Sequence, residues 1–217
     1  MIWGGVLLVV VWAIGTLFSR ADWGGLHLNW LDGWTRLLCR LLHGVKTTPL
    51  LLPEQGAAIV AANHVSGLDP LLLIAASRRP LRFLIASEEY HRPVLHWLFR
   101  AAGCIPVDRQ GRPEKALRAA LAALEKGDVV ALFPHGGIHL DSDAPKRIKA
   151  GVVRLAAWSG AAVYPVRIDG VTAQGKVLTA PFVPSRVTLT IGTPIRVDDT
   201  DHKAAIQSIT MAIETPR

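Results

Sequence analysis

The stretch NHVSGLDP, residues 63–70, decides how the rest of the chain is interpreted. It follows a short apolar run, residues 57–62, which has the character of a buried strand. His64 stands at the end of that run, and Asp69 follows five positions later, beyond a Ser-Gly turn. At this spacing the carboxylate can fold back onto one imidazole nitrogen and leave the other nitrogen free as a base. The stretch therefore predicts a catalytic His–Asp pair, with a surface turn that merely carries both residues as the alternative.

Together with Asn63, the His-x4-Asp pattern resembles the catalytic motif of the 1-acylglycerol-3-phosphate acyltransferases, within the glycerolipid acyltransferase superfamily. Three further blocks follow in the order found in that family, and the resemblance covers roughly residues 53–170. The blocks are GCIPVDR at 103–109, FPHGGI at 133–138 and VYPVRIDG at 163–170. The resemblance implies that His64 is the general base, that Asp69 orients it, and that Asn63 belongs to the substrate-binding residues.

The second and fourth blocks concern substrate binding. GCIPVDR resembles the family segment that ends in an Asp-Arg pair and helps to bind the phosphate of the acceptor. Arg109, at a strand exit, offers a rigid bidentate fork for two phosphate oxygens, and a surface salt bridge is the alternative. VYPVRIDG resembles the Val-Pro-Val strand of the family, which lines the acyl-chain and donor region.

The third block departs from the family pattern Phe-Pro-Glu-Gly-Thr-Arg. His135 stands in place of the Glu, Gly137 in place of the Thr and Ile138 in place of the Arg, whereas Pro134 and Gly136 are kept. We therefore expect the loop shape to persist, with His135, Gly136 and Gly137 in the substrate site and the backbone N–H groups of the two glycines as oxyanion donors. The lost carboxylate and guanidinium leave the identity of the acceptor open.

Positive charge for an acceptor phosphate has a second source in PKRIKAG, residues 145–151, which resembles the Lys-rich stretch of the family. Lys146, Arg147 and Lys149 could replace the missing guanidinium, and a phosphate there would meet free N–H groups at a helix start. A solvated or lipid-facing basic loop is the alternative. A metal site is a weaker interpretation of the neighbouring polar residues, and we expect none. That set comprises His135, His139, Asp141 and Asp143.

Composition points to a membrane surface. Half of the 217 residues are apolar, and the formal net charge is +7. A basic, apolar protein suits either nucleic acid or an anionic membrane. Five of the seven Trp residues lie in the first 34 positions, among apolar neighbours and not between Lys or Arg. This is typical of anchoring at a lipid interface and argues against nucleic acid as a partner.

Two amino-terminal segments have sequence patterns that favour contact with a membrane. Residues 2–18 form an uncharged apolar run, short for a bilayer span, and the flanks expected of a cleaved signal peptide are missing. If this run spans, the basic residues after it place the rest of the chain in the cytoplasm, at the inner membrane. Residues 22–45 have an amphipathic helical pattern suited to the lipid interface, with a core-facing helix as the alternative. The polar face comprises Asn29, Asp32, Arg36, Arg40 and His43.

The expected organisation is thus a membrane-anchoring helical part, residues 1–45, and an acyltransferase domain, residues 46–217. Alternating short apolar runs and helical patterns after residue 53 predict a layered α/β/α domain with a mixed, mostly parallel sheet. Expected strands are 57–62, 82–86, 104–107, 129–133, 162–168 and 187–191, the last one antiparallel. Expected helices in this part are 71–76, 113–126 and 203–213. Cys39 and Cys104 form no disulfide framework, which favours a reducing compartment.

The resemblance implies a membrane-bound O-acyltransferase of phospholipid biosynthesis. Its partners would be the lipid bilayer, a lysophospholipid acceptor (by default 1-acylglycerol-3-phosphate) and acyl-CoA or acyl carrier protein as donor, with no metal or other cofactor. Two alternatives stay open. One is a different lysolipid acceptor, such as a lyso-amino-acid lipid, and the other is a lipid-binding relative without catalysis.

Overall fold

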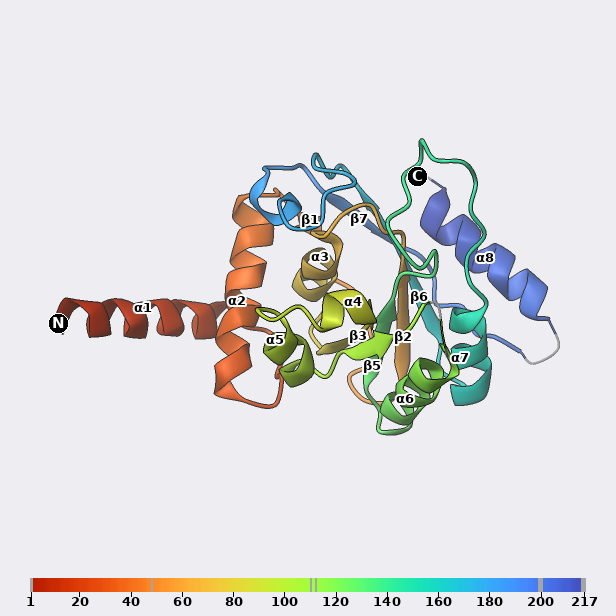
Figure 1. The fold of residues 1–217 in the computed structure, drawn as a ribbon, viewed down its shortest axis with the longest axis horizontal. Helices are drawn as coiled ribbons and strands as arrows, with labels where there is room; N and C mark the ends of the chain where they lie inside the picture. The colour runs from red at the N-terminus through yellow and green to blue at the C-terminus, as the bar shows by residue number, and fades with distance from the viewer. Residues whose placement is uncertain (1, 48, 110, 112, 199–200, 216–217) are drawn as a thin grey trace.

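The computed structural model describes residues 2–47, 49–109, 111, 113–198 and 201–215. Within these residues the chain forms one sheet flanked by helices, with a helical hairpin at the amino terminus (Figure 1). The strands are β1 Lys46–Thr47, β2 Ala58–Ala62, β3 Leu81–Ala86, β4 Ile105–Val107, β5 Val129–Leu132, β6 Val163–Asp169 and β7 Thr188–Ile191. The helices are α1 Ile2–Phe18, α2 Leu26–Leu41, α3 Asp69–Ala76, α4 Ser87–Tyr90, α5 His96–Ala101, α6 Pro113–Glu125, α7 Gly151–Ser159, the 3-10 helix η1 Ala180–Phe182 and α8 His202–Glu214.

The sheet has the order β1-β7-β6-β2-β5-β3-β4. Every pairing in it is parallel except that between β6 and β7. This confirms the expected mixed, mostly parallel sheet and the antiparallel last strand. The central strand β2 is buried on both faces, as expected of a parallel strand covered by helices on two sides.

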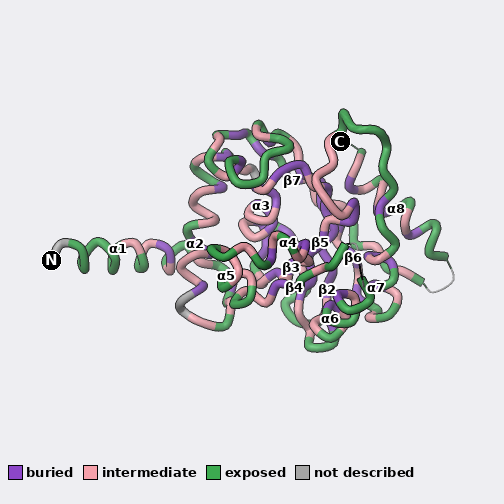
Figure 2. Tube along the Cα trace, in the orientation of Figure 1, coloured by how far each residue is buried: buried purple, intermediate pink, exposed green. Residues whose placement is uncertain are grey.

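Alternation along β2 divides the core into two halves. Val60 and Ala62 pack with α3, on the face that α2 also adjoins. Ile59 and Ala61 pack with α6, α7 and α8 on the other face. Figure 2 shows the strands and the inner helix faces as buried, with exposed residues along the outer helices. The expected α/β/α layering is therefore observed.

Parallel strands bring their carboxyl ends to one edge of the sheet. β2 ends just before His64, β4 just before Asp108 and Arg109, and β5 just before Phe133. Because β2, β5, β3 and β4 are parallel neighbours in that order, these three sequence blocks arrive at the same edge. The topology thus gathers motifs that are far apart in the sequence.

The helical hairpin stands on the opposite side of the molecule from α8, with α1 projecting from the body (Figure 1). The two helices cross closely, because a Cβ on Gly33 would overlap the carbonyl oxygen of Gly15. The indole Nε1–H of Trp34 donates to the carbonyl of Val11 across the crossing, at 3.0 Å. Among the helices of the described ranges, none is both long and apolar enough to cross a bilayer, which does not support the interpretation of α1 as a span.

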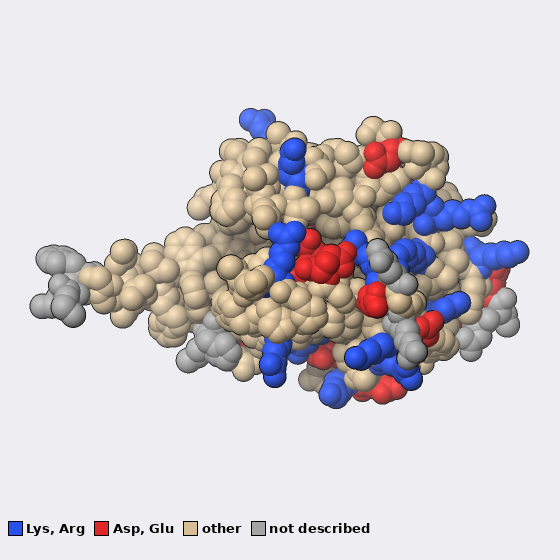
Figure 3. Space-filling view, in the orientation of Figure 1, with Lys and Arg blue, Asp and Glu red and all other residues tan. Residues whose placement is uncertain are grey.

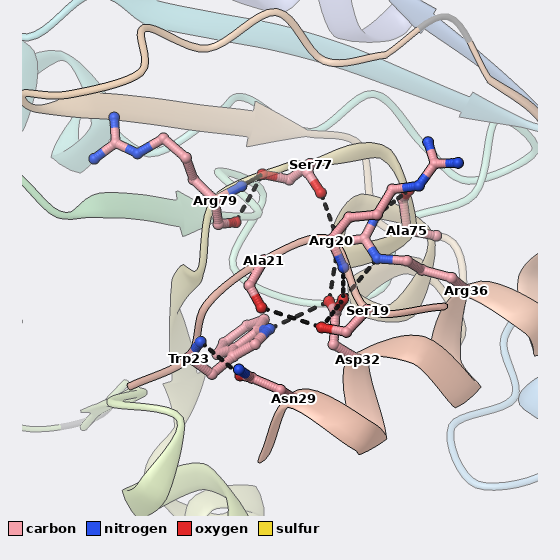
Figure 4. Close-up of polar contacts among 10 residues, drawn as sticks. All are labelled: Ser19, Arg20, Ala21, Trp23, Asn29, Asp32, Arg36, Ala75, Ser77 and Arg79. Carbon is pink, nitrogen blue, oxygen red and sulfur yellow. Dashed lines mark hydrogen bonds and ion pairs between the residues drawn. The ribbon is translucent and has the colours of Figure 1, made fainter. Parts of the chain in front are cut away.

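Asp32 and Arg36, on the polar face of α2, are turned toward the body of the protein (Figure 4). Asp32 is 3% exposed and accepts hydrogen bonds from the indole of Trp23 (3.2 Å) and from Arg36 (2.7 and 2.9 Å). Arg36 also donates to the carbonyls of Ala75 (2.9 Å) and Ser77 (2.7 Å) at the end of α3. The core-facing alternative therefore describes Asp32 and Arg36, whereas Arg40 of the same face is exposed.

Candidate active site

The predicted His–Asp pair forms in the structure. The Nδ1 atom of His64 lies 2.8 Å from Oδ2 of Asp69. An ionised carboxylate can only accept, so Nδ1 carries the proton in this contact and the lone pair of Nε2 stays available as a base. We call His64 and Asp69 the dyad, and residues 63–70 the dyad turn.

The carboxylate of Asp69 is fully buried and held in place by the dyad turn. Its Oδ2 accepts from the backbone N–H groups of Val65 (2.6 Å) and Ser66 (2.9 Å), and its Oδ1 accepts from the Ser66 hydroxyl (2.8 Å). Asp69 is also the first residue of α3, where the helix dipole favours a negative charge. These contacts fix the carboxylate and, through it, the imidazole.

The imidazole of His64 faces a cleft. The ring stacks on Phe133 with a centroid separation of 4.1 Å, and the carbonyl of His64 accepts from the backbone N–H of His139 at 2.8 Å. The dyad turn is therefore held by the loop that carries the third block. His64 lines a cleft with a volume of about 840 Å³.

The cleft is mainly apolar. Its walls come from α2, α3, β3, α5, α6, α7 and the connection between β6 and β7. Its lining includes Leu28, Leu31, Phe83, Leu98, Phe99, Cys104 and Leu178. Burial raises the pKa of the Cys104 thiol to about 11, so this cysteine is a neutral thiol near pH 7 and no nucleophile.

One part of the cleft carries positive charge. Arg109, Lys149 and Arg154 line it together with Gly136 and Gly137. The side chain of Lys149 lies against Gly136, where a Cβ would come within 2.6 Å of Nζ. A Cβ on Gly137 would lie 3.9 Å from Nη1 of Arg109. Because Gly136 has no Cβ, the Lys149 side chain can lie against the loop backbone, and Arg109 lies beside Gly137 at an ordinary contact distance.

Lys146 and Arg147 do not belong to this group. Both are exposed and do not line the cleft. Of the basic stretch predicted to supply charge, only Lys149 reaches the site. Its backbone N–H donates to the carbonyl of Pro134 at 2.8 Å, which fastens this stretch to the third block.

His135 lies away from the cleft, contrary to its expected place in the substrate site. It is 1% exposed, and its Nε2 lies 2.8 Å from Oε1 of Glu214 on α8. Its ring stacks on His139 with a centroid separation of 4.8 Å. The side chain points away from the cleft and toward the carboxylate of Glu214 on α8.

Asn63 and the glycine N–H groups also have defined surroundings. The Asn63 amide exchanges two hydrogen bonds with the backbone of Ile168, at 2.9 and 2.7 Å, which joins the end of β2 to β6. The N–H of Gly136 donates to the carbonyl of Phe133 at 2.9 Å. Of the two expected oxyanion donors, the N–H of Gly137 is the one left without a hydrogen bond within the described chain.

No group of three or more His, Cys, Asp or Glu side chains suited to a metal ion occurs among the residues that the structure describes. Asp141 instead forms an ion pair with the buried Arg167, at 2.7 Å. The contribution of α2 and α5 to the cleft was missing from the sequence analysis. Apolar cleft-lining residues such as Leu31 and Leu98 carry no pattern that separates them from ordinary core residues.

The chain is similar in sequence and in fold to known acyltransferases. The family model described as "Acyltransferase" matches residues 45–169. The chain is 32% identical over 143 residues to a lyso-ornithine lipid O-acyltransferase of Rhodobacter capsulatus, covering 61% of this chain and 51% of that protein. It is 30% identical over 139 residues to a probable 1-acyl-sn-glycerol-3-phosphate acyltransferase of Mycoplasma genitalium, covering 59% and 51%. The chain thus spans about half the length of these two curated relatives.

Two further proteins are more evenly matched in length. A 1-acyl-sn-glycerol-3-phosphate acyltransferase of Bacillus subtilis is 24% identical over 152 residues, covering 70% of this chain and 73% of that protein. The crystal structure of the 1-acyl-sn-glycerophosphate (LPA) acyltransferase PlsC from Thermotoga maritima superposes with a TM-score of 0.71 at 21% identity. That alignment covers 98% of this chain and 86% of the other, and at this identity it establishes a shared fold.

Proposed function

This chain belongs to the acyltransferase family, and on that basis we propose that it transfers a fatty acyl group from a thioester to the hydroxyl of a lysophospholipid. The observation that carries the proposal is the dyad, a His64 imidazole fixed by a buried carboxylate with its free nitrogen at an apolar cleft. An apolar cleft can bind an acyl chain, and the free imidazole nitrogen can accept the proton of a hydroxyl group.

The proposed reaction has one addition and one elimination. Nε2 of His64 takes the proton of the acceptor hydroxyl while that oxygen attacks the thioester carbonyl carbon. Asp69 keeps the tautomer and stabilises the imidazolium that forms. When the tetrahedral intermediate collapses, the C–S bond breaks and the thiolate takes the proton from His64. No protein nucleophile is required, because the acceptor oxygen forms the new bond itself.

The oxyanion of the intermediate needs donors. The N–H of Gly137 is available in the cleft, and the ammonium of Lys149 lies beside the same loop. The backbone N–H of Lys149 donates to the carbonyl of Pro134, so the segment that carries the ammonium is fixed to the loop that carries Gly137. We therefore assign Gly137 and Lys149 to oxyanion stabilisation or acceptor binding in the proposed reaction.

The acceptor is proposed to carry an anionic head group, with 1-acylglycerol-3-phosphate as the first candidate and phosphatidic acid as the product. Arg109 and Lys149 flank the Gly136–Gly137 backbone, and Arg154 adds a third cation to the cleft. Arg109 has a competing partner in Glu88 at 3.5 Å, but both side chains are exposed, so this pair is weak. A phosphate could displace it.

A second acceptor class is favoured by the altered third block. Ile138 stands where the family pattern has an Arg, and His135 has turned to Glu214, so the usual acceptor groups are absent from the cleft. An amino-acid lysolipid such as lyso-ornithine lipid, the substrate named for the Rhodobacter relative, is the second candidate. Its carboxylate would need fewer cations than a phosphate.

We propose that the protein works at the cytoplasmic face of the inner membrane, with acyl-CoA or acyl carrier protein as donor. α1 exposes a series of apolar side chains to its surroundings, which include Leu7, Leu8, Val9 and Leu17. An apolar helix projecting from the body is better accommodated by lipid than by water. The proposal is interfacial attachment through the hairpin.

The test is acyl transfer by the purified full-length protein from radiolabelled acyl-CoA, or from acyl carrier protein, to a panel of lysolipids. The panel holds lysophosphatidic acid, lysophosphatidylglycerol and lyso-ornithine lipid. We expect product with at least one acceptor, lost in His64→Ala and kept in His202→Ala, which alters an exposed histidine on α8. A folded protein without product for any pair, or equal turnover by His64→Ala, would overturn the proposal.

A further inference from the structure

Residues 133–150, called the third-block loop here, connect β5 to α7 and pass beside α8 (Figure 1). On one side the loop meets the dyad turn, where the N–H of His139 donates to the carbonyl of His64 at 2.8 Å. Gly137 of the same loop lines the cleft. The loop contains no helix or strand, so contacts with other elements decide where the N–H of Gly137 lies.

On its other side the loop meets the last residue of α8. The His135 side chain is buried, and its Nε2 lies 2.8 Å from Oε1 of Glu214. An ionised carboxylate can only accept, so Nε2 carries a proton and donates it to Glu214. The His135 ring also stacks on the ring of His139, the residue that binds the His64 carbonyl. Direct contacts therefore lead from α8 to the backbone beside the dyad.

The carboxyl end of α8 is itself fixed to the sheet by the buried Arg167 on β6. The guanidinium donates to the carbonyls of Ile213 and Glu214, in the last turn of the helix, where carbonyls lack intrahelical partners. Arg167 also forms ion pairs with Asp141 of the third-block loop at 2.7 Å and with Asp169 at 2.9 Å. The Glu214 carboxylate is therefore presented to the loop from an anchored helix end.

An imidazole at position 135 fits this arrangement, and a carboxylate does not. The family pattern has a Glu where this chain has His135. A Glu there would face the Glu214 carboxylate at a buried position, and two carboxylates that share a site repel one another. His135 donates to Glu214 instead, so the carboxylate comes from α8 and not from the loop.

The cations of the cleft have supports of their own. Lys149 contacts the loop through the Pro134 carbonyl, but it lies two residues before α7, and Arg109 lies two residues after β4. Loss of the His135 contact should therefore displace Gly137 more than it displaces either cation.

We propose that His135 and Glu214 are a positioning pair, through which α8 holds the third-block loop so that the Gly137 N–H stays where the oxyanion forms. The effect on turnover rests on the proposed acyl transfer, whereas the hold on the loop does not. Neither side chain lines the cleft, so the pair acts through the loop and not on the substrate.

The first test reads the loop without turnover. Figure 3 shows Lys and Arg side chains projecting from the side of the molecule where the third-block loop and α8 lie. Lys146 and Arg147 of the loop are exposed, so trypsin can reach them. Glu214→Ala leaves the buried Nε2–H of His135 without its acceptor, and we expect cleavage after these two residues to become several-fold faster.

Two controls show whether the release is local. Cleavage of Glu214→Ala after Lys126, exposed just beyond α6, should keep its native rate. Gln207→Ala, exposed on α8, should be cleaved like the native chain, and thermal unfolding checks the fold of each variant. Native cleavage of the loop in a folded Glu214→Ala protein would overturn the proposal. So would equal acceleration after Lys126, because the whole molecule would then have loosened.

The second test is kinetic and uses the lysolipid that the native chain acylates. The kcat of Glu214→Ala should fall about tenfold to a hundredfold, less than the loss of about 10²–10³ on removal of an oxyanion donor, because Gly137 is displaced and not deleted. The KM for the acceptor should stay within about twofold, since the cations keep their places. Glu214→Gln keeps an acceptor oxygen for His135 and should retain most of the turnover.

An exchange of the two side chains tests the pair directly. His135→Glu alone should lose turnover through repulsion from Glu214, and His135→Glu with Glu214→His should recover most of it, because donor and acceptor have changed places. If the exchanged chain does not fold, the comparison of Glu214→Ala with Glu214→Gln still decides. Equal losses in those two variants, native kcat in Glu214→Ala, or a loss confined to the acceptor KM would overturn the positioning role. A native chain that acylates no lysolipid would reject the proposed function, and the cleavage rates would still show whether α8 holds the loop.

Discussion

Four hydrogen bonds converge on the carboxylate of Asp69, from the His64 imidazole, two backbone N–H groups and the Ser66 hydroxyl. Asp69→Asn replaces one carboxylate oxygen with an NH₂ group. Because the groups around Asp69 are hydrogen-bond donors, this NH₂ group would meet donors where it needs acceptors. We expect the imidazole to lose its fixed tautomer and turnover to fall by about 10²–10⁴. Acyl transfer kinetics with the preferred lysolipid measure this, with Asp198→Asn, at an exposed position, as the control.

The Michaelis constant separates this role from a loss of acceptor binding, and thermal unfolding separates it from a general loss of structure. A tautomer defect lowers the catalytic constant and leaves acceptor binding nearly unchanged, because the cations of the cleft are untouched. A folded Asp69→Asn protein with native turnover would show that the dyad contact does not serve catalysis.

Charge at the acceptor site gives a second prediction. Arg109→Ala should raise the Michaelis constant for lysophosphatidic acid sharply, since a charge-assisted bidentate contact is worth about 1.5–3 kcal/mol. Lys149→Ala should raise it as well, because its ammonium lies beside the same loop. The matched control is Arg147→Ala, which removes a cation outside the cleft and should leave this constant unchanged. Equal kinetics for all three variants would remove the phosphate assignment.

The buried His43 predicts a dependence of stability on pH. Its side chain is fully buried, Nε2 contacts the carbonyl of Pro181, and Nδ1 finds no hydrogen-bond partner within the described structure. Burial lowers the pKa of His43 below its ordinary value of 6.5. Between the lowered pKa and 6.5 the unfolded chain binds more protons than the folded one, so the free energy of unfolding falls as pH falls through this window.

Urea unfolding above and below pH 6.5 measures the effect. His43→Gln keeps a donor for Pro181 but does not titrate, so it should lose part of the acid destabilisation. His202→Gln, on the exposed start of α8, should keep the native pH dependence. If the two variants respond to pH alike, His43 does not control acid stability.

Residues whose role depends on local spacing could be predicted from the sequence. The five-residue spacing of His64 and Asp69 predicted the dyad contact. The position of Arg109, two residues after the end of β4, predicted its place at the edge of the sheet. The direction of His135 could not be predicted, because its partner Glu214 lies on a helix far along the chain. The helical pattern placed Asp32 on the polar face of α2, but not its contacts with Ser19, Arg20 and Trp23, which precede the helix.

At the scale of elements, the crossing of α1 and α2 depends on two glycines. Gly33→Leu places a side chain where the Gly15 carbonyl now lies, so α1 should be forced away from α2. We expect a loss of about 1–3 kcal/mol from overpacking, together with faster proteolysis of the connection between the helices. Gly4→Leu is the control, since a Cβ there meets nothing within 4 Å. Native proteolysis rates in Gly33→Leu would show that the crossing is not essential.

Buried strands and helices with clear end signals were predictable, whereas β1 and the shortest helices were not. Buried strands such as β2 and β5 are continuous apolar runs, and α6 begins at Pro113 and is followed by Gly127, which has φ 83°. By contrast, β1, α4, α5 and η1 have two to six residues. Segments of that length show no complete period, so tertiary contacts determine them. Because α4, α5 and η1 contribute to the cleft, its lining could not be predicted in full from the sequence.

For the whole molecule, composition indicated a basic, apolar protein, but it did not indicate where on the surface the exposed apolar residues lie. α1, with exposed apolar residues such as Leu7 and Leu8, stands on one side of the molecule, and α8 stands on the other (Figure 1). Both core clusters are built without residues 2–18. The body should therefore be stable without α1, and α1 should act mainly through the surroundings of the protein.

Deletion of residues 2–18 tests this division. The shortened chain keeps Ser19 and Arg20, whose contacts with the Asp32 carboxylate hold the start of α2. We expect cooperative thermal unfolding to persist, because no buried core residue is removed, while binding to anionic vesicles weakens by about tenfold or more. Vesicle flotation and calorimetry measure the two properties, and Val9→Ser in the full chain is a control that keeps the helix. Loss of cooperative unfolding would show that α1 is part of the folded core, and unchanged flotation would show that the body binds the bilayer alone.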